Sequence, residues 1–181
     1  MRVIAGSARG TKLHCPEGLA VRPTHDRVKE AVFSMLGEQV SGAQVLDLFA
    51  GTGALGIEAL SRGAAQAVFV DVSASSLKTV ADNISKTRLT DKAQLIQSDF
   101  STYLTDTEKT FDLIFLDPPY SRGYIEQALK SIADNALLTP NGIIYCELED
   151  DLPPSLLRLY QILRDKKYGR AHVLLLKELS V

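Results

Sequence analysis

The chain is poor in the residues that build metal centres and disulfides. It contains two cysteines, Cys15 and Cys146, which are far apart and match no metal-binding or redox spacing, and its three histidines are scattered. We therefore expect no metal site. The cysteines are interpreted as free thiols of a protein in the reducing cytoplasm.

The sequence also lacks a hydrophobic run of membrane-spanning length, a signal-peptide pattern, an internal repeat and a low-complexity segment. At 181 residues it is expected to form one domain, 1–181, and to act as a monomer. Within it, residues 1–40 are predicted to form an N-terminal extension and residues 41–181 the core.

No strong charge of either sign marks the whole chain, whose net charge is −2. The N-terminal 29 residues differ, because they carry six basic residues against two acidic ones. This basic excess has two interpretations: a solvated surface, or an arm that faces a polyanion.

What is present is a regular alternation of strand and helix patterns. The stretches "RVIAG" and "GTKLHC" predict a β-hairpin, and "RPTHDRVKEAVFSML" predicts an amphipathic helix. From residue 44 onward, five apolar strands alternate with helices, the last of them, "IIYCEL", following a turn at Pro140-Asn141-Gly142. Apolar strands flanked by helices are typical of a parallel sheet that is covered on both faces.

The end of the chain departs from this alternation. The stretches "YQILRDKKY" and "RAHVLLLKEL" are joined only by a tight turn near Gly169, so the two strands must be antiparallel. The predicted fold is therefore an α/β domain with helices on both faces of a mostly parallel sheet that ends in an antiparallel hairpin.

A glycine-rich loop follows the first parallel strand. Gly51 and Gly53 allow a tight turn in which backbone N–H groups approach a ligand, and Asp71 ends the next strand, where it can bind ribose hydroxyls. The glycines match the NAD fingerprint, but Asp47 before the loop would repel a pyrophosphate and attract a cation. The pattern therefore favours S-adenosylmethionine (SAM) over NAD.

Four acidic residues end successive parallel strands, namely Asp47, Asp71, Asp99 and Asp117. Because the carboxyl ends of parallel strands share one edge of the sheet, we expect these side chains to lie near one ligand. Asp99 suits the adenine amino group, and Phe100 can pack on the adenine ring.

The fourth of these strands ends in "DPPY". Each proline fixes φ and lacks an N–H, so Asp117 and the carbonyl of Pro118 form two acceptors with no competing donor between them. An exocyclic amine offers two donors, and Tyr120 offers a face on which a base can stack. Because the lone pair of such an amine is delocalised into the ring, fixed acceptors favour the pyramidal nitrogen that attacks a methyl group. The base itself must be unpaired or flipped out.

These stretches resemble a known family. "LDLFAGTGALGIEALSRGA" and "FDLIFLDPPY" resemble class I SAM-dependent amino-methyltransferases, and "RVIAGSARGTKLHCPEGLAVRPTHDRVKEAVFSML" resembles the bacterial RsmD-type enzymes, guanine-N2 methyltransferases of 16S ribosomal RNA. The resemblance implies a seven-stranded sheet and a substrate in the small ribosomal subunit. It implies that Asp117, Pro118, Pro119 and Tyr120 hold the target guanine.

The resemblance also implies the cofactor contacts. SAM would be bound by Asp47, Phe49, Ala50, Gly51, Thr52, Gly53, Asp71, Val72, Ser98, Asp99 and Phe100. Arg22 and Thr24 match an N-terminal motif near the cofactor, although helix capping also explains Thr24. For the basic arm we expect Arg2, Arg9 and Lys12 to contact RNA phosphates, with the last hairpin, Arg164 to Arg170, as the alternative surface.

Other functions remain open at this point. The "DPPY" motif is shared with N6-adenine methyltransferases of DNA, although the absence of a separate recognition domain disfavours a sequence-reading DNA enzyme. Methyltransferases of glutamine side chains more often carry Asn at the position of Asp117. A non-catalytic RNA-binding protein of the same fold would tend to lose Asp117 or the glycine loop, and both are intact.

Overall fold

The computed structural model describes residues 1–16, 23–119, 123–148, 151–169 and 171–179. Its helices are α1 (Pro23–Leu36), α2 (Ala54–Ser61), α3 (Ala74–Thr87), α4 (Phe100–Asp106) and α5 (Tyr124–Asp134). Its strands are β1 (Gln44–Asp47), β2 (Gln66–Asp71), β3 (Ala93–Gln97), β4 (Phe111–Leu116), β5 (Leu138–Leu148), β6 (Tyr160–Tyr168) and β7 (Ala171–Glu178). In this part of the chain no helix has the length and apolar character that a bilayer span requires.

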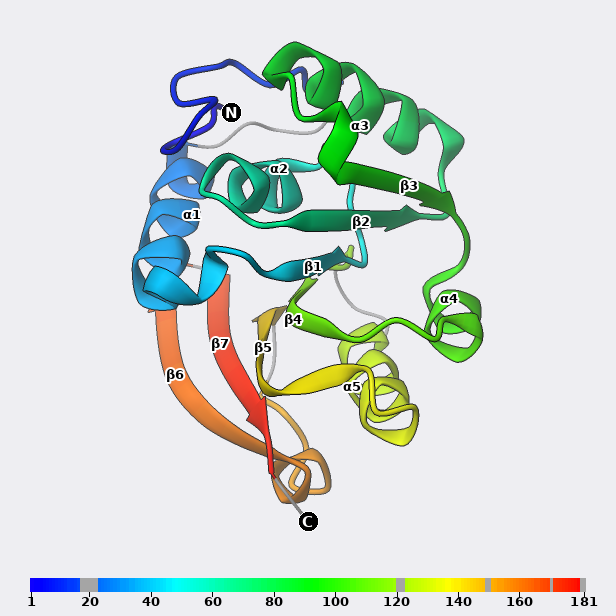
Figure 1. Cartoon of the computed structure of the whole chain (residues 1–181). Coiled ribbons are helices and arrows are strands. Elements are labelled where there is room, and N and C mark those ends of the chain that lie inside the picture. The colour runs from blue at the N-terminus through cyan, green and yellow to red at the C-terminus, as the bar shows by residue number, and fades with distance from the viewer. Residues whose placement is uncertain (17–22, 120–122, 149–150, 170, 180–181) are drawn as a thin grey trace.

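The seven strands form one sheet in the order β3-β2-β1-β4-β5-β7-β6 (Figure 1). The first five strands are parallel, and β7 pairs antiparallel with both β5 and β6. A dinucleotide-binding sheet has a sixth parallel strand in the place where this sheet inserts β7. The predicted fold class, including its C-terminal antiparallel hairpin, is confirmed.

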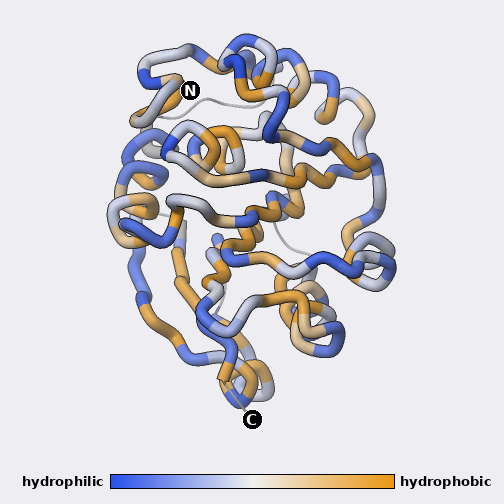
Figure 2. The backbone as a smooth tube through the Cα atoms, viewed as in Figure 1, coloured by the Kyte–Doolittle hydropathy of each residue, from blue (hydrophilic) through white to orange (hydrophobic). Residues whose placement is uncertain are grey.

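Helices cover both faces of the sheet, as the alternating pattern predicted. One apolar cluster joins α1, α2 and α3 to one face, and a second joins α4 and α5 to the other. Figure 2 shows the apolar residues concentrated along the central strands, with hydrophilic residues on the outer parts of the chain. The two-sided burial explains why β4, "FDLIFL", is apolar along nearly all of its length.

Two sequence predictions are refined by the structure. The predicted N-terminal β-hairpin is short: Arg2 and Lys12 form an antiparallel bridge, and the N–H groups of Val3 and Leu13 donate to the carbonyls of Thr11 and Met1. The arm, residues 1–16, also bonds to helix α2. The turn predicted at Pro140-Asn141-Gly142 lies inside β5, where the pairing with β4 shifts from Phe111↔Leu138 to Leu113↔Ile143. Residues 139–142 of β5 therefore lie opposite one residue of β4, so the predicted turn is an irregularity within the strand.

The arm is fixed to the core by a buried carboxylate. Glu58 of α2 is fully buried and accepts hydrogen bonds from the backbone N–H groups of Ile4, at 2.8 Å, and Ala5, at 3.0 Å. Lys29 of α1 lies 3.3 Å from the same carboxylate, and Arg62 lies 2.8 Å from it. The Lys29 ammonium also donates to the carbonyl of Arg2 at 2.6 Å. Four donors therefore satisfy this buried charge, and two of them belong to the arm.

We predict that Glu58→Ala lowers the free energy of unfolding by about 3–5 kcal/mol, because it leaves the buried Lys29 without its partner. Urea unfolding measures this loss. Hydrogen exchange at the amides of Ile4 and Ala5 should accelerate as well. Exchange that stays as slow as in the wild type would contradict the role of Glu58 in holding the arm, and Glu126→Ala, at an exposed site on α5, is the matched control.

Candidate active site

A cavity of about 580 Å³ opens at the carboxyl edge of the parallel strands. It lies beside the point where the chain order reverses, because β1 is flanked by β2 on one side and β4 on the other. Most of its described wall was predicted from the sequence: Phe49, Gly51, Asp71, Val72, Ser98, Asp99, Phe100, Asp117, Pro118 and Pro119. Sequence reasoning missed Leu48, Ser76, Tyr124 and Glu147.

The glycine loop is closed by Asp71. One oxygen of its carboxylate accepts from the N–H of Gly51 at 2.9 Å, and the other accepts from the N–H of Ser73 at 2.8 Å. Gly53 precedes α2 in the left-handed conformation, at φ 76°. A Cβ on Gly56 would lie 2.3 Å from the ring of Phe69, so this glycine permits the close packing of α2 on β2. Asp71 therefore shapes the loop while still facing the cavity.

An aromatic cluster forms the other wall. The rings of Phe49 and Phe100 lie 5.2 Å apart, and Tyr124 lies 6.1 Å from Phe49 and 5.3 Å from Phe100. Beside it, Asp99 caps α4 by accepting from the N–H and the hydroxyl of Ser101, and these hydrogen bonds, that of the side chain first, lower the pKa of Asp99. The cavity thus has an apolar wall for a flat ring next to ionised acceptors.

Asp47 has a different place from the one predicted. It is buried and does not line the cavity, and its carboxylate accepts from the N–H of Gly56 at 3.0 Å. Burial raises its pKa to about 7, and the charge of Asp71 adds to this rise. Asp47 therefore supports the loop from behind. Ala50, Thr52 and Gly53 likewise lie in the loop but not on the described wall.

Asp117 follows β4 and stands where two cavities meet, as Glu147 does. It lines the large cavity and also a small one of about 50 Å³, which is bounded by Met1, Val28, Lys29, Ala54, Leu55, Tyr145 and Glu147. Asp117 remains exposed to solvent. Partial loss of hydration, together with the negative charges of Glu147 and Asp47, raises its pKa to about 8.

Three predicted residues cannot be placed in this site. Tyr120 and Arg22 lie outside the described residues, and Thr24 belongs to α1, where only its backbone is described. In the described part of the chain no group of three or more His, Cys, Asp or Glu side chains is arranged to hold a metal ion.

The missed Glu147 had a signal in the sequence. It stands near the end of the fifth strand, "IIYCEL", just as Asp47, Asp71 and Asp117 stand at the ends of earlier strands. The same positional argument would have found it. Tyr124 and Ser76 belong to helices that pack near the edge, and no local motif marks them.

The fold and the site define a class I methyltransferase, and the comparisons agree. A solved structure titled "Putative methyltransferase yhhF from Escherichia coli" superimposes with a TM-score of 0.89 at 34% identity, over 98% of this chain and 97% of that one. The family model described as "Conserved hypothetical protein 95" matches residues 1–177. The chain belongs to this family, and the predicted RsmD-type membership is confirmed.

Two relatives show the range of similarity. "Putative rRNA methyltransferase YlbH" of Bacillus subtilis is 39% identical over 183 residues, which cover 98% of this chain and 99% of the relative. "Ribosomal RNA small subunit methyltransferase D" of Escherichia coli K12 is 37% identical over 155 residues, which cover 84% of this chain and 78% of the relative.

We predict that Asp47→Asn changes how stability depends on pH. The folded pKa of Asp47, about 7, lies above its ordinary value of 3.8, so from pH 4 to 7 the folded state keeps a proton that the unfolded state has lost. The free energy of unfolding must then fall as pH rises through this window and level off above it.

An asparagine at this position can still accept from Gly56 but does not titrate. Urea unfolding at pH 4.5, 6 and 8 should therefore show that the free energy of unfolding of Asp47→Asn rises relative to that of the wild type until the pH reaches about 7. Asp82→Asn, at an exposed site on α3, serves as the control. A difference between Asp47→Asn and wild type that is the same at all three pH values would contradict the buried, protonated state of Asp47.

Proposed function

We propose that this protein transfers a methyl group from SAM to the exocyclic N2 amine of a guanine in 16S ribosomal RNA, acting in the cytoplasm as a monomer. The observation that carries the proposal is the position of Asp117, Pro118 and Pro119, on the wall of the large cavity at the carboxyl edge of β4. The names of the relatives support ribosomal RNA of the small subunit as the substrate.

In this proposal the large cavity holds the cofactor. The aromatic cluster of Phe49, Phe100 and Tyr124 packs against adenine, and Asp71 accepts from the ribose hydroxyls. When bound, SAM supplies an electrophilic methyl group. Asp117 and the carbonyl of Pro118 accept the two N–H groups of the target amine and so aim its lone pair at that methyl group.

Binding of the target base requires Asp117 to act as an acceptor. Loss of hydration and the negative charges of Glu147 and Asp47 raise the pKa of Asp117 to about 8, so the ionised, accepting form is favoured as pH rises above neutral.

The reaction is tested by incubating the protein with labelled SAM and undermethylated small subunits, with naked RNA and DNA as controls. Nucleoside analysis should find N2-methylguanosine in the 16S ribosomal RNA. Label in N6-methyladenosine, or in DNA alone, would favour the N6-adenine methyltransferase function instead.

Two substitutions should separate cofactor binding from catalysis. Asp71→Ala should weaken SAM binding by about 1–3 kcal/mol, because ribose hydroxyls lose a charged acceptor. Asp117→Ala should leave SAM affinity nearly intact and lower turnover by about 10²–10³, because its contact acts mainly in the transition state. Calorimetry and single-turnover rates measure the two effects. If Asp117→Ala lost SAM binding and methylation equally, its assigned role would be wrong.

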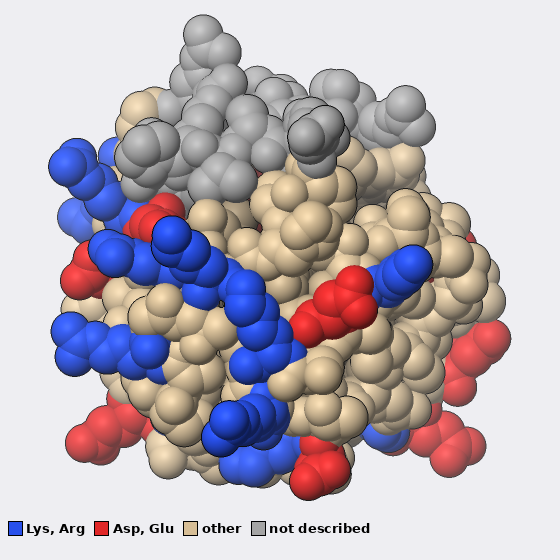
Figure 3. Space-filling view, turned by 90° about the horizontal axis from the view of Figure 1, so that it is seen from above, with Lys and Arg blue, Asp and Glu red and all other residues tan. Residues whose placement is uncertain are grey.

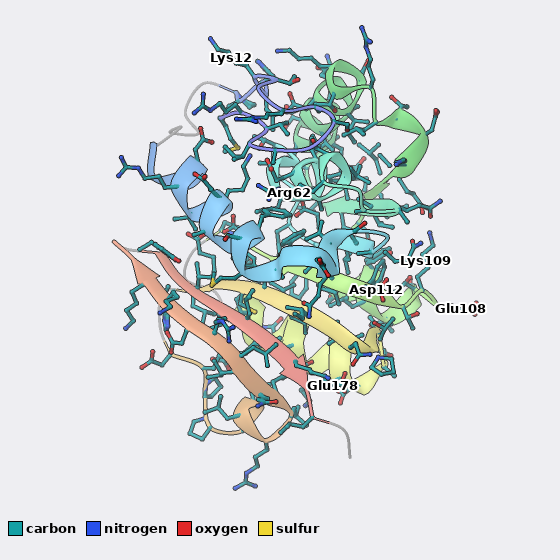
Figure 4. The ribbon with its side chains drawn as sticks, turned by 60° about the vertical axis from the view of Figure 1, so that its left-hand side comes forward. Lys12, Arg62, Glu108, Lys109, Asp112 and Glu178 are labelled. Atoms are coloured by element: carbon teal, nitrogen blue, oxygen red, sulfur yellow. The ribbon has the colours of Figure 1, made fainter. Side chains whose placement is uncertain are left out.

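The arm offers a surface for RNA phosphates. Arg2 and Arg9 line a second cavity, of about 510 Å³, together with Arg27, Asp26 and Glu30. Seen from above, Lys and Arg side chains form a band that starts on the side of the arm and runs toward the centre of the view (Figure 3). Lys12 stands on the outer side of the arm, away from the sheet (Figure 4).

We predict that replacing Arg2, Arg9 and Lys12 together weakens binding to the particle. The slope of log affinity against log salt should flatten by up to about 0.7–0.9 per lost phosphate contact. SAM affinity and the identity of the methylated base should not change, because phosphate contacts position a substrate without reading its sequence. If the triple variant bound and methylated the particle like the wild type, the RNA-binding surface would be assigned to the last hairpin instead. Replacing Lys166 and Lys167 together provides the comparison variant for that surface.

A further inference from the structure

Glu147 and Asp117 lie side by side at the edge of the sheet. Strands β4 and β5 are parallel neighbours, and their pairing ends at Phe115↔Tyr145 and Leu116↔Cys146. Asp117 and Glu147 are each the next residue in this register, so they stand on the same face as Phe115 and Tyr145. The rings of Phe115 and Tyr145 are in edge contact at 5.9 Å, as expected for neighbours on one face.

The two carboxyl groups also share both cavities. Asp117 and Glu147 are the described residues common to the large cavity and the small one beside Met1 and Lys29. A base whose amine meets Asp117 at this junction can turn its Watson–Crick edge toward Glu147. Glu147 itself is largely buried, at 8% exposure, so its orientation is fixed by the protein.

Tyr145 holds the Glu147 carboxylate in place. Its hydroxyl donates to one oxygen of Glu147 at 3.0 Å. Burial raises the pKa of Tyr145 well above its ordinary value, so the hydroxyl keeps its proton at neutral pH and remains a donor. A carboxylate offers about four lone-pair positions, so a carboxylate held by several donors can still accept a further one.

The bases differ in the atom beside the amine. On its Watson–Crick edge guanine carries N1–H, a donor, next to the N2 amine. Adenine carries N1 and cytosine carries N3, both acceptors, next to their amines. A carboxylate oxygen beside Asp117 accepts from the guanine donor but offers no donor to the other two bases. Enzymes that act on extruded bases read them by this edge.

We infer that Glu147 accepts the N1–H of the target guanine and is thereby the residue that selects guanine over other amine-bearing bases. This inference rests on the proposed guanine-N2 methylation. It adds a chemical reason for that specificity, because Asp117 and Pro118 alone accept any exocyclic amine.

The sharpest probe is 2-aminopurine, which keeps the N2 amine but has an acceptor at N1. Small subunits are assembled with ligated 16S ribosomal RNA that carries either guanine or 2-aminopurine at the nucleotide that the wild-type protein methylates. The measured quantity is the ratio of kcat/KM for the two particles. Comparing variant with wild-type ratios cancels the different intrinsic reactivity of the two amines.

Glu147→Gln should lower the guanine preference by about 10- to 100-fold, because the glutamine amide can turn to donate to an acceptor at N1. Tyr145→Phe should lower it less, since the carboxylate remains but loses its fixed orientation. Glu126→Gln, on the exposed side of α5, should keep the wild-type ratio. SAM affinity and the unfolding midpoint are measured for each variant, and Tyr145→Phe decides the test if Glu147→Gln does not fold.

If Glu147→Gln and Tyr145→Phe both kept the wild-type ratio of kcat/KM within threefold, the inference would be overturned. Guanine methylation itself would remain established. If the wild-type protein methylates no guanine amine in small subunits, the proposed function fails first and the inference falls with it. The two failures are therefore distinguishable.

Discussion

The site depends on one constraint of parallel sheets, which is that neighbouring strands end at the same edge. Strands β1 and β4 are adjacent, but the chain leaves β1 toward β2 and leaves β4 toward β5, so the loops that follow them separate. The cavity occupies this separation. The same constraint aligns Asp47, Asp117 and Glu147, because each stands at or just beyond the last paired residue of its strand.

Gathering carboxylates at one edge has an electrostatic cost. Loss of hydration and neighbouring negative charge raise the pKa of Asp47 to about 7 and that of Asp117 to about 8, so this edge of the sheet favours protonation or a cation. Hydrogen bonds from Gly51, Ser73 and Gly56 offset part of this cost. The proposed cofactor, with its sulfonium and ammonium groups, would offset more, and an anionic pyrophosphate would add to the repulsion. The negative charge at the carboxyl edge of the sheet thus favours SAM, the ligand that the sequence pattern also favoured.

The sequence predicted most of the fold because local signals agreed with each other. Strand and helix periodicity, the glycine loop and the tight turn at Gly169 are local, and they determined the element order and the terminal hairpin. The contacts of the arm with α2 were not predicted, because Glu58 lies more than 50 residues away in the chain from the backbone that it binds. The contact between Asp47 and Gly56 was not predicted for a related reason, since only the packing of α2 brings this N–H to the carboxylate.

One short helix connects the arm to the glycine loop. The N–H of Gly56 in α2 binds Asp47 at the end of β1, and Glu58, two residues later, holds the backbone of the arm. Ser61, at the end of the same helix, donates to the carbonyl of Ala5 and accepts from the N–H of Ala8. An RNA held by the arm would therefore be fixed relative to the loop through a rigid element of eight residues. In the proposed reaction, this connection would set the position of a large substrate on the arm relative to the carboxylate edge.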